Sequence, residues 1–175
     1  MNLIKRLFIR PLEPSVRQHP SKLSGWITLH EALTEVLPVA KKLDRAARLT
    51  FVTSGLDMQH DGRSLTWEFL FFLPKRSATL MLSLEPDAQA EDPDSAVTTL
   101  TQRVNKALPA DAEKSPLPMQ VRDSPEVVAE LAAKGADFVA GANDMKLESR
   151  VSSGKALWVT YDFDKEFTTS FAADE

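Results

Sequence analysis

Cysteine is absent from the 175 residues, and glycine is sparse, with six in the chain. Without cysteine there are no disulfide bonds, thiolate metal sites or cysteine nucleophiles. The glycines are too scattered to form a loop that cradles a nucleotide phosphate. No apolar stretch reaches the roughly 20 residues of a membrane-spanning helix. With 43% hydrophobic residues the chain can still bury a core, so we expect a folded protein without cofactor or transmembrane segment.

The residues that could perform chemistry form two weak clusters. Asp57, His60 and Asp61 lie in "LDMQHDG", whose Asp and Gly are typical of a tight turn between strands. Asp162, Asp164 and Glu166 alternate at a second turn, but the glycine and later glutamate of a calcium-binding loop are missing. We therefore predict no catalytic residue and no metal ligand. The alternative is a hydrolase-like enzyme that uses the turn of His60 and Asp61.

Charge is distributed unevenly although the net charge is only -4. The beginning of the chain is basic and its middle is acidic; the basic residues are Lys5, Arg6, Arg10, Arg17 and Lys22, and the acidic ones are Glu85, Asp87, Glu91, Asp92 and Asp94. A nucleic-acid-binding surface needs clustered cations together with base-reading or stacking groups. The sequence shows no such combination, so nucleic acid is not an expected partner.

The first twelve residues, "MNLIKRLFIRPL", lack the long apolar stretch and the small-residue cleavage site of a secretory signal. This absence predicts a cytoplasmic location. If the segment is helical, Lys5, Arg6 and Arg10 lie off a stripe formed by Leu3, Ile4, Leu7 and Phe8, which is the pattern of a membrane-surface anchor. We prefer an ordinary helix on the core or a mobile terminus, and keep a peripheral membrane protein anchored by residues 1–12 as an alternative.

Hydrophobic periodicity predicts a helix and then three strands in the first half of the chain. The helix begins with a capping box formed by Thr28 and Glu31 and has apolar residues at helical spacing from Leu29 to Ala47. Pro38 is expected to kink or break it. The following runs "RLTFVTS", "SLTWEFLFFL" and "SATLMLSL" predict an antiparallel meander.

The second half repeats this order. Ser124 as N-cap and Pro125 at the first helical position begin a helix, and "MKLESRV", "ALWVTYDF" and "EFTTSFA" follow as strands. A single offset of 92 aligns Val36 with Val128, Gly62 with Gly154 and Trp67 with Val159. We predict an α+β fold of two tandem repeats, each a helix followed by a three-stranded or larger antiparallel sheet.

The predicted organisation has three parts. The first repeat spans residues 1–84 with the basic N-terminal segment, and the second spans 119–175. Residues 85–118 form an acidic, proline-containing linker with a helix, whose apolar stripe is Ala96, Val97, Leu100, Val104, Ala107 and Leu108.

Large apolar residues on the sheet face away from the helix are candidates for partner binding. Strand alternation under the same alignment places Trp158 and Thr160 on that face in the second half, and Leu70 and Phe72 in the first. These four residues are the predicted contact surface for a protein partner or for a second copy of the chain. The alternatives are that the two sheets pack against each other through them, or that linker segments cover them.

The motifs "DGRSLTW" and "SGKALW", each a glycine turn leading a tryptophan into the middle strand, resemble the PepSY-like group. The tandem arrangement is similar to the beta-lactamase-inhibitor-protein architecture, over residues 26–84 and 119–172. The resemblance implies a non-catalytic module that binds or inhibits another protein, for example an enzyme, and an exported location. One departure is that aligning Trp67 with Trp158 requires an offset of 91, which breaks the glycine match.

Overall fold

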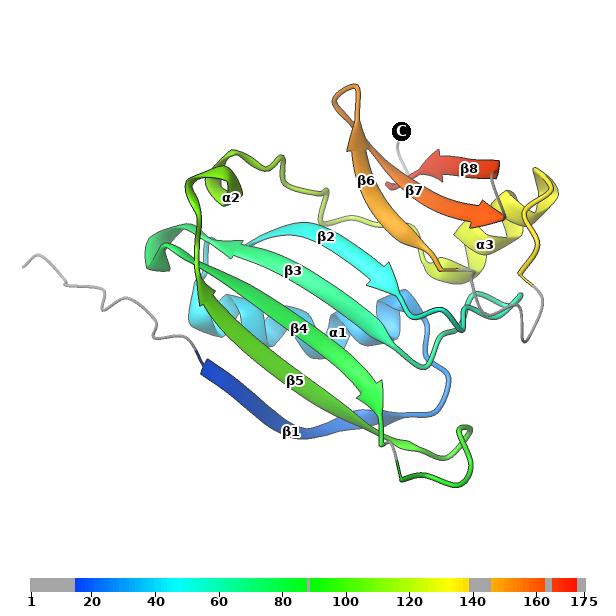
Figure 1. The fold of residues 1–175 in the computed structure, drawn as a ribbon, viewed down its shortest axis with the longest axis horizontal. Helices are drawn as coiled ribbons and strands as arrows, with labels where there is room; N and C mark the ends of the chain where they lie inside the picture. The colour runs from blue at the N-terminus through cyan, green and yellow to red at the C-terminus, as the bar shows by residue number, and fades with distance from the viewer. Residues whose placement is uncertain (1–14, 88, 139–145, 163–164, 173–175) are drawn as a thin grey trace, which may run out of the picture.

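The computed structural model describes residues 15–87, 89–138, 146–162 and 165–172. Their strands form one antiparallel sheet of eight in the order β1-β5-β4-β3-β2-β6-β7-β8 (Figure 1). In chain order the elements are β1 (Ser15–Ser24), α1 (Leu29–Leu43), β2 (Arg48–Ser54), β3 (Trp67–Leu73), a 3-10 turn (Pro74–Arg76), β4 (Ala78–Pro86), β5 (Val97–Lys106), α2 (Pro109–Glu113), α3 (Ser124–Ala133), β6 (Glu148–Ser152), β7 (Lys155–Asp162) and β8 (Lys165–Ser170). The α+β class is thus confirmed, with one continuous sheet.

Helix α1 forms where the capping box predicts it. The backbone N–H of Glu31 donates to the Thr28 hydroxyl, and the Glu31 carboxylate accepts from the Thr28 N–H at 2.7 Å. The helix continues without a break through Pro38, which lies on its exposed side. Leu29, Ala32, Leu33, Val36 and Ala40 form its buried stripe, and the predicted break at Pro38 is wrong.

The core of the first half lies between α1 and one face of the sheet. Trp67, Phe69 and Phe71 of β3 point to this face and are essentially unexposed. Their cross-strand neighbours on β4 are Leu84, Leu82 and Leu80, which are also buried. The predicted meander is confirmed, since β2, β3 and β4 pair consecutively and antiparallel.

Helix α3 covers the same face of the sheet in the second half. Thr169 of β8, which bonds to Glu130 of α3, is the cross-strand partner of Trp158. The indole of Trp158 stacks on Phe171 with ring centroids 4.6 Å apart. Both belong to the same hydrophobic cluster as α1 and β3, so one core extends beneath both helices.

Two strands differ from the sequence prediction. Residues 97–106, expected as a helix, form β5 between β4 and β1. Val97, Thr98, Thr99, Thr101 and Val104 are β-branched, and this composition favours a strand. Segment 85–118 is therefore not simply a linker: its helix is the short α2. Strand β1 was not predicted. It pairs with β5 from Ser15, opposite Val104, to Ser24, opposite Val97.

The offset of 92 residues aligns neither the two helices nor the tryptophans of the two middle strands. The N-caps of the two helices are Thr28 and Asp123, which are 95 residues apart. The buried tryptophans of the two middle strands are Trp67 and Trp158, which are 91 apart. Asp123 also replaces Ser124 as the predicted N-cap of α3. The predictions for residues 1–12 lie outside the described residues, among which no helix is long and apolar enough to cross a membrane.

Candidate functional site: an uncovered sheet face with a notch

The register shows that α1 and α3 leave one face of the whole sheet without a helix. A single row of cross-strand partners crosses all eight strands on that face. From edge to edge the row is Gln18, Thr101, Ser83, Glu68, Thr53, Glu148, Val159 and Thr168. The neighbouring residues Val52, Phe69 and Trp158 point to the helix side, because side chains alternate along a strand. We call this helix-free surface the open face; it faces the viewer in Figure 1.

The centre of the open face is apolar. Phe51 of β2, Leu70 of β3 and Met81 of β4 are successive cross-strand partners and are half-buried. The row continues through Arg103 of β5 to Val16 of β1. The row described above runs beside it; there Thr53, Ser83 and Thr101 are buried, whereas Glu68 and Glu148 are half-buried. The accessible apolar side chains of the centre make this face a candidate contact surface.

A notch interrupts the sheet where the two halves meet. β2 and β6 share one bridge, Thr53 with Glu148, and then diverge. Elsewhere the edge of β2 is held by non-ladder contacts: the Leu117 N–H donates to Leu49 O and the Val52 N–H to the Ser149 hydroxyl, both at 2.8 Å. The resulting cavity has a volume of about 470 Å³ and is lined by Thr50, Phe51, Lys114, Ser115, Glu148, Ser149, Arg150 and Val151. Phe51 belongs both to the lining of this cavity and to the apolar row, so the two are adjacent.

Ion pairs order the charged side chains around the notch. Arg150 donates to both carboxylate oxygens of Glu166, one bond measuring 2.9 Å. These bonds lower the pKa of Glu166 and raise the pKa of Arg150. Burial raises the pKa of the neighbouring Tyr161 hydroxyl, and Glu166 raises it further. On the other side Lys114 binds Asp111 at 2.9 Å and lowers the pKa of that carboxyl.

The predicted contact residues are mostly not on the surface. Trp158 and Thr160 are fully buried and Phe72 is 7% exposed; Leu70, half-buried on the open face, remains accessible. The predicted exposure of Trp158 and Thr160 is wrong because the alignment placed β7 one residue out of register, and a shift of one residue exchanges the two faces of a strand. Phe72 does lie on the open face, but the Arg48 guanidinium lies 4.9 Å from its ring centroid.

The turn that contains His60 is a structural turn. The Asp57 carboxylate accepts from the Ser64 hydroxyl at 2.8 Å and from the Leu65 N–H. The Asp61 carboxylate accepts from the Arg63 N–H and lies 4.0 Å from its guanidinium. Both acids thus hold the turn, and within the described part of the chain neither is hydrogen-bonded to His60.

The second acidic cluster is split by the structure. Glu166 is bound to Arg150, whereas the side chains of Asp162 and Asp164 lie outside the described residues. Among the residues that are described, no group of histidine and acidic side chains is placed to hold a metal ion.

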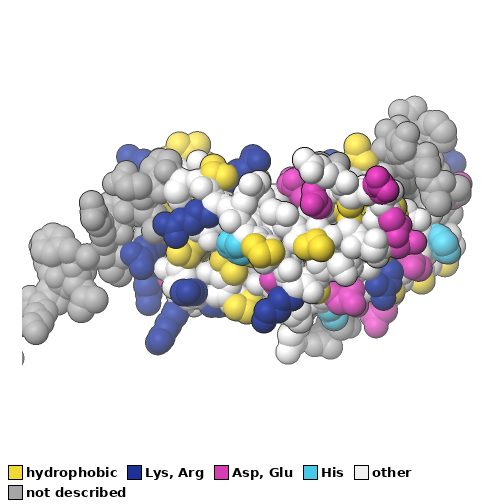
Figure 2. Space-filling model, turned by 90° about the horizontal axis from the view of Figure 1, so that it is seen from below, with side chains coloured by type: hydrophobic (Ala, Val, Ile, Leu, Met, Phe, Trp, Pro, Cys, Tyr) yellow, Lys and Arg dark blue, Asp and Glu magenta, His cyan; other side chains and the backbone are white. Residues whose placement is uncertain are grey.

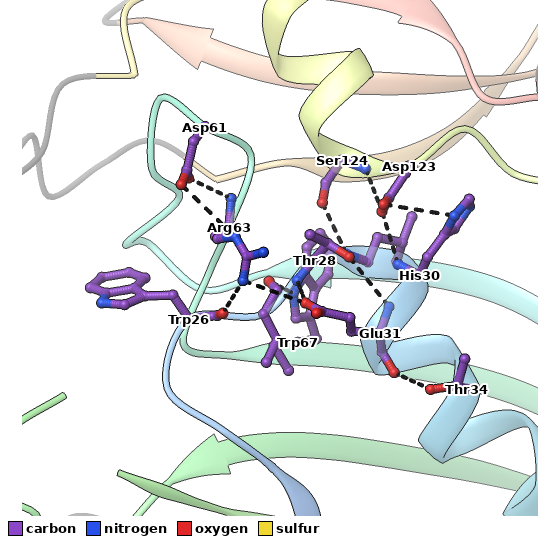
Figure 3. Close-up of polar contacts among 12 residues, drawn as sticks. Trp26, Thr28, His30, Glu31, Thr34, Asp61, Arg63, Trp67, Asp123 and Ser124 are labelled. Carbon is purple, nitrogen blue, oxygen red and sulfur yellow. Dashed lines mark hydrogen bonds and ion pairs between the residues drawn. The ribbon is translucent and has the colours of Figure 1, made fainter. Parts of the chain in front are cut away.

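The helix N-termini of the two halves meet in a shared polar joint (Figure 3). Asp123 caps α3 through the Ser124 N–H and also accepts from the His30 N–H of α1, both at 2.9 Å. The Ser124 hydroxyl accepts from the Leu29 N–H at 2.9 Å. The His30 ring lies 2.7 Å from Val121 O. Asp123 and Ser124 at the start of α3 thus cap the first N–H groups of α1. This joint fixes how the two parts of the sheet are oriented.

A second network holds α3 against β8. Glu130 accepts from Lys134 at 2.8 Å, from the Thr169 hydroxyl, and from Arg122 at 2.7 Å. These three donors, Lys134 foremost, lower the pKa of Glu130 to about 2. The depressed pKa predicts that the ionised carboxylate stabilises the folded state above pH 4.5 and that this contribution is lost as the pH falls towards 2.

We expect the variant Glu130→Gln to be less stable than wild type by about 1 kcal/mol at pH 6, a small value because the side chain is 38% exposed and solvent screens the charges. The difference should decrease below pH 4.5 and disappear near pH 2. Urea unfolding of both proteins across this range measures it. A difference that stays constant with pH would show that the carboxylate charge does not contribute.

The candidate site residues that the sequence prediction missed are Phe51, Met81 and the notch residues of β6. Strict alternation along "RLTFVTS" would place Phe51 on the same face as the buried Leu49. A bulge between residues 49 and 51 instead puts Phe51 on the opposite face. No sequence signal marks that bulge. Met81 alternates with buried Leu80 and Leu82 and could have been found from the pattern alone.

Comparison with known proteins gives no family assignment: no family model, no curated protein and no solved structure matches this chain.

Proposed function

We propose that this chain is a non-catalytic module that binds, and can thereby inhibit, another protein through its open face. The observation that supports the proposal is the arrangement of the helices: both lie on one face of an eight-stranded sheet, and the apolar row of Phe51, Leu70 and Met81 lies on the other. No helix lies over these half-buried apolar side chains, so a partner can reach them.

The notch adds a second element to this interface. Its mouth combines an apolar side chain, Phe51, with the exposed side chains of Val151 and Arg150. A projecting apolar residue of the partner that enters such a pocket is desolvated, which is how binding hot spots act. The open face thus supplies area, and the notch supplies an anchor position.

We further propose that the two halves are diverged copies of one helix-plus-sheet unit. Trp67 and Trp158 support this, because each lies in the second strand after its helix and each is fully buried on the helix side. Gly62 and Gly154, in the turns before these strands, share a positive φ of 80°. In this interpretation the copies differ by four residues in the length between helix cap and tryptophan, so no single offset aligns them.

The resemblance to PepSY-like domains and to the beta-lactamase-inhibitor-protein architecture leads to the same proposed function. In that architecture the sheet surface receives the partner enzyme. The same resemblance implies an exported location.

Site-specific photo-crosslinking tests the proposed interface. A photoreactive amino acid at Met81, on the open face, is expected to give a discrete covalent adduct in native cells. The same residue at Thr34, exposed on α1, is the matched control and should give none. The additional substitution Leu70→Asp should abolish the Met81 adduct while the protein remains folded by circular dichroism. Equal labelling from both positions, or from neither, would contradict the proposal.

A further inference from the structure

Basic side chains gather at one end of the sheet. The register brings together the start of β1, the end of α1, the turn between β3 and β4, and the end of β5, since Ser15 pairs with Val104, and Ala78 with both Leu73 and Lys106. We call this end the basic pole; its exposed cations are Arg17, Lys41, Lys42, Arg45, Lys75, Arg103 and Lys106. Figure 2 shows lysine and arginine side chains concentrated towards one end and acidic ones towards the other.

The charges of the basic pole are not neutralised within the described structure. None of these seven side chains forms an ion pair with another described residue, whereas Arg63, Arg122 and Arg150 elsewhere do. In residues 15–17, 41–48, 73–78 and 103–113 the acids are Asp44, Asp111 and Glu113. Asp44 is buried and accepts from the Lys75 and Ala46 N–H groups, and Asp111 pairs with Lys114. The pole is thus mainly cationic, and an anionic partner would neutralise charges that repel one another.

Exposed apolar side chains accompany the cations. Val16 is 65% exposed at the start of β1, and Leu108 is 68% exposed just after β5. At the opposite end the hairpin between β4 and β5 carries Glu91, Asp92 and Asp94, and its charge would orient that end away from an anionic surface.

We propose that the basic pole docks on an anionic lipid surface, with Val16 and Leu108 entering the interfacial layer. Lipid rather than nucleic acid is favoured because the apolar residues gain from burial in a membrane. Single-stranded nucleic acid is instead bound on stacking aromatics, and no aromatic residue is among the exposed large hydrophobics of the described chain. The membrane surface meets the open face at Val16 and Arg103. The apolar centre of the open face, formed by Phe51, Leu70 and Met81, would remain available to a protein partner.

Vesicle flotation with the full chain tests this proposal. Vesicles of phosphatidylcholine containing about a third phosphatidylserine should bind the protein, and pure phosphatidylcholine vesicles should not. Each cation near an anionic surface contributes about fivefold in affinity, so Lys42→Glu/Lys106→Glu should weaken binding by at least about tenfold. Raising the salt from about 0.1 M to about 0.5 M should also release the protein.

The control is Lys155→Glu/Lys165→Glu. Both lysines are exposed in the second half, and the double variant changes the net charge by the same amount. It should bind within about twofold of wild type, and both variants should show wild-type circular dichroism. Equal loss in the two variants, no loss in either, or binding to DNA or RNA but not to vesicles would overturn the proposal. Replacing Leu108 by serine should weaken binding without altering its salt dependence.

Discussion

Replacing Gly62 by alanine is expected to lower the free energy of unfolding by about 3 kcal/mol, because two separate costs act at this position. The backbone φ of Gly62 is +80°, where side chains other than glycine are strained. In addition a Cβ atom would lie 2.4 Å from the backbone N and Cα of Pro125 and 2.6 Å from the carbonyl carbon of Ser124. The turn would have to move away from α3 and disturb the joint between the halves.

Gly154 provides the matched control for this experiment. It has the same φ of +80°, but a Cβ there would meet no atom within 4 Å. Gly154→Ala therefore measures the backbone strain alone, about 1–2 kcal/mol. Urea unfolding of both variants gives the difference, which is the contribution of the close contact with α3. Equal destabilisation by the two substitutions would show that the contact is not tight in solution.

Trp158→Ala is expected to destabilise the protein by about 3–5 kcal/mol, the usual cost of removing a large aromatic residue from a core. The side chain is fully buried and stacks on Phe171. Its indole nitrogen is buried without a hydrogen-bond partner among the described residues, so the ring acts through packing. Trp158→Phe should for this reason cost much less, about 1–2 kcal/mol, since it keeps an aromatic ring and removes the unpaired polar group.

Leu157→Ala is the control for Trp158. Leu157 precedes it in β7, points to the open face and is half-buried; its loss should cost about 1 kcal/mol. Thermal and urea unfolding compare the three variants. If Trp158→Ala left stability unchanged but removed partner binding, the placement of Trp158 beneath α3 would be wrong and the original prediction of an exposed contact residue would be restored.

Hydrophobic periodicity predicted the elements whose structure is determined by neighbouring residues in the sequence. Helix α1 and strands β2, β3 and β4 were found because their apolar spacing and turn residues are unambiguous over seven or more residues. Strand β5 was mistaken for a helix because Ala96, Leu100, Val104 and Ala107 also recur every three to four residues. In this case the β-branched composition, not the spacing, determined the structure.

The candidate site depended on features that are not local. The face occupied by Trp158 changes with a shift of one residue, and the correct register follows only from the pairing of β7 with β8 under α3. The notch arises because β6 leaves β2 after one bridge, a divergence that no side-chain pattern encodes. The basic pole combines residues from four segments, and Arg17 is the one member that the sequence analysis placed in a basic region.

The position of β1 determines the order in which the first half can be completed. Ser15 pairs with Val104, so the two partners are 89 positions apart in the chain. During synthesis on the ribosome β1 has no partner strand until β5 has left the exit tunnel, and closing so long a loop is slow. β1 is thus the last strand to dock in its half, and a chaperone that binds nascent chains would find it unpaired while β2, β3 and β4 are made.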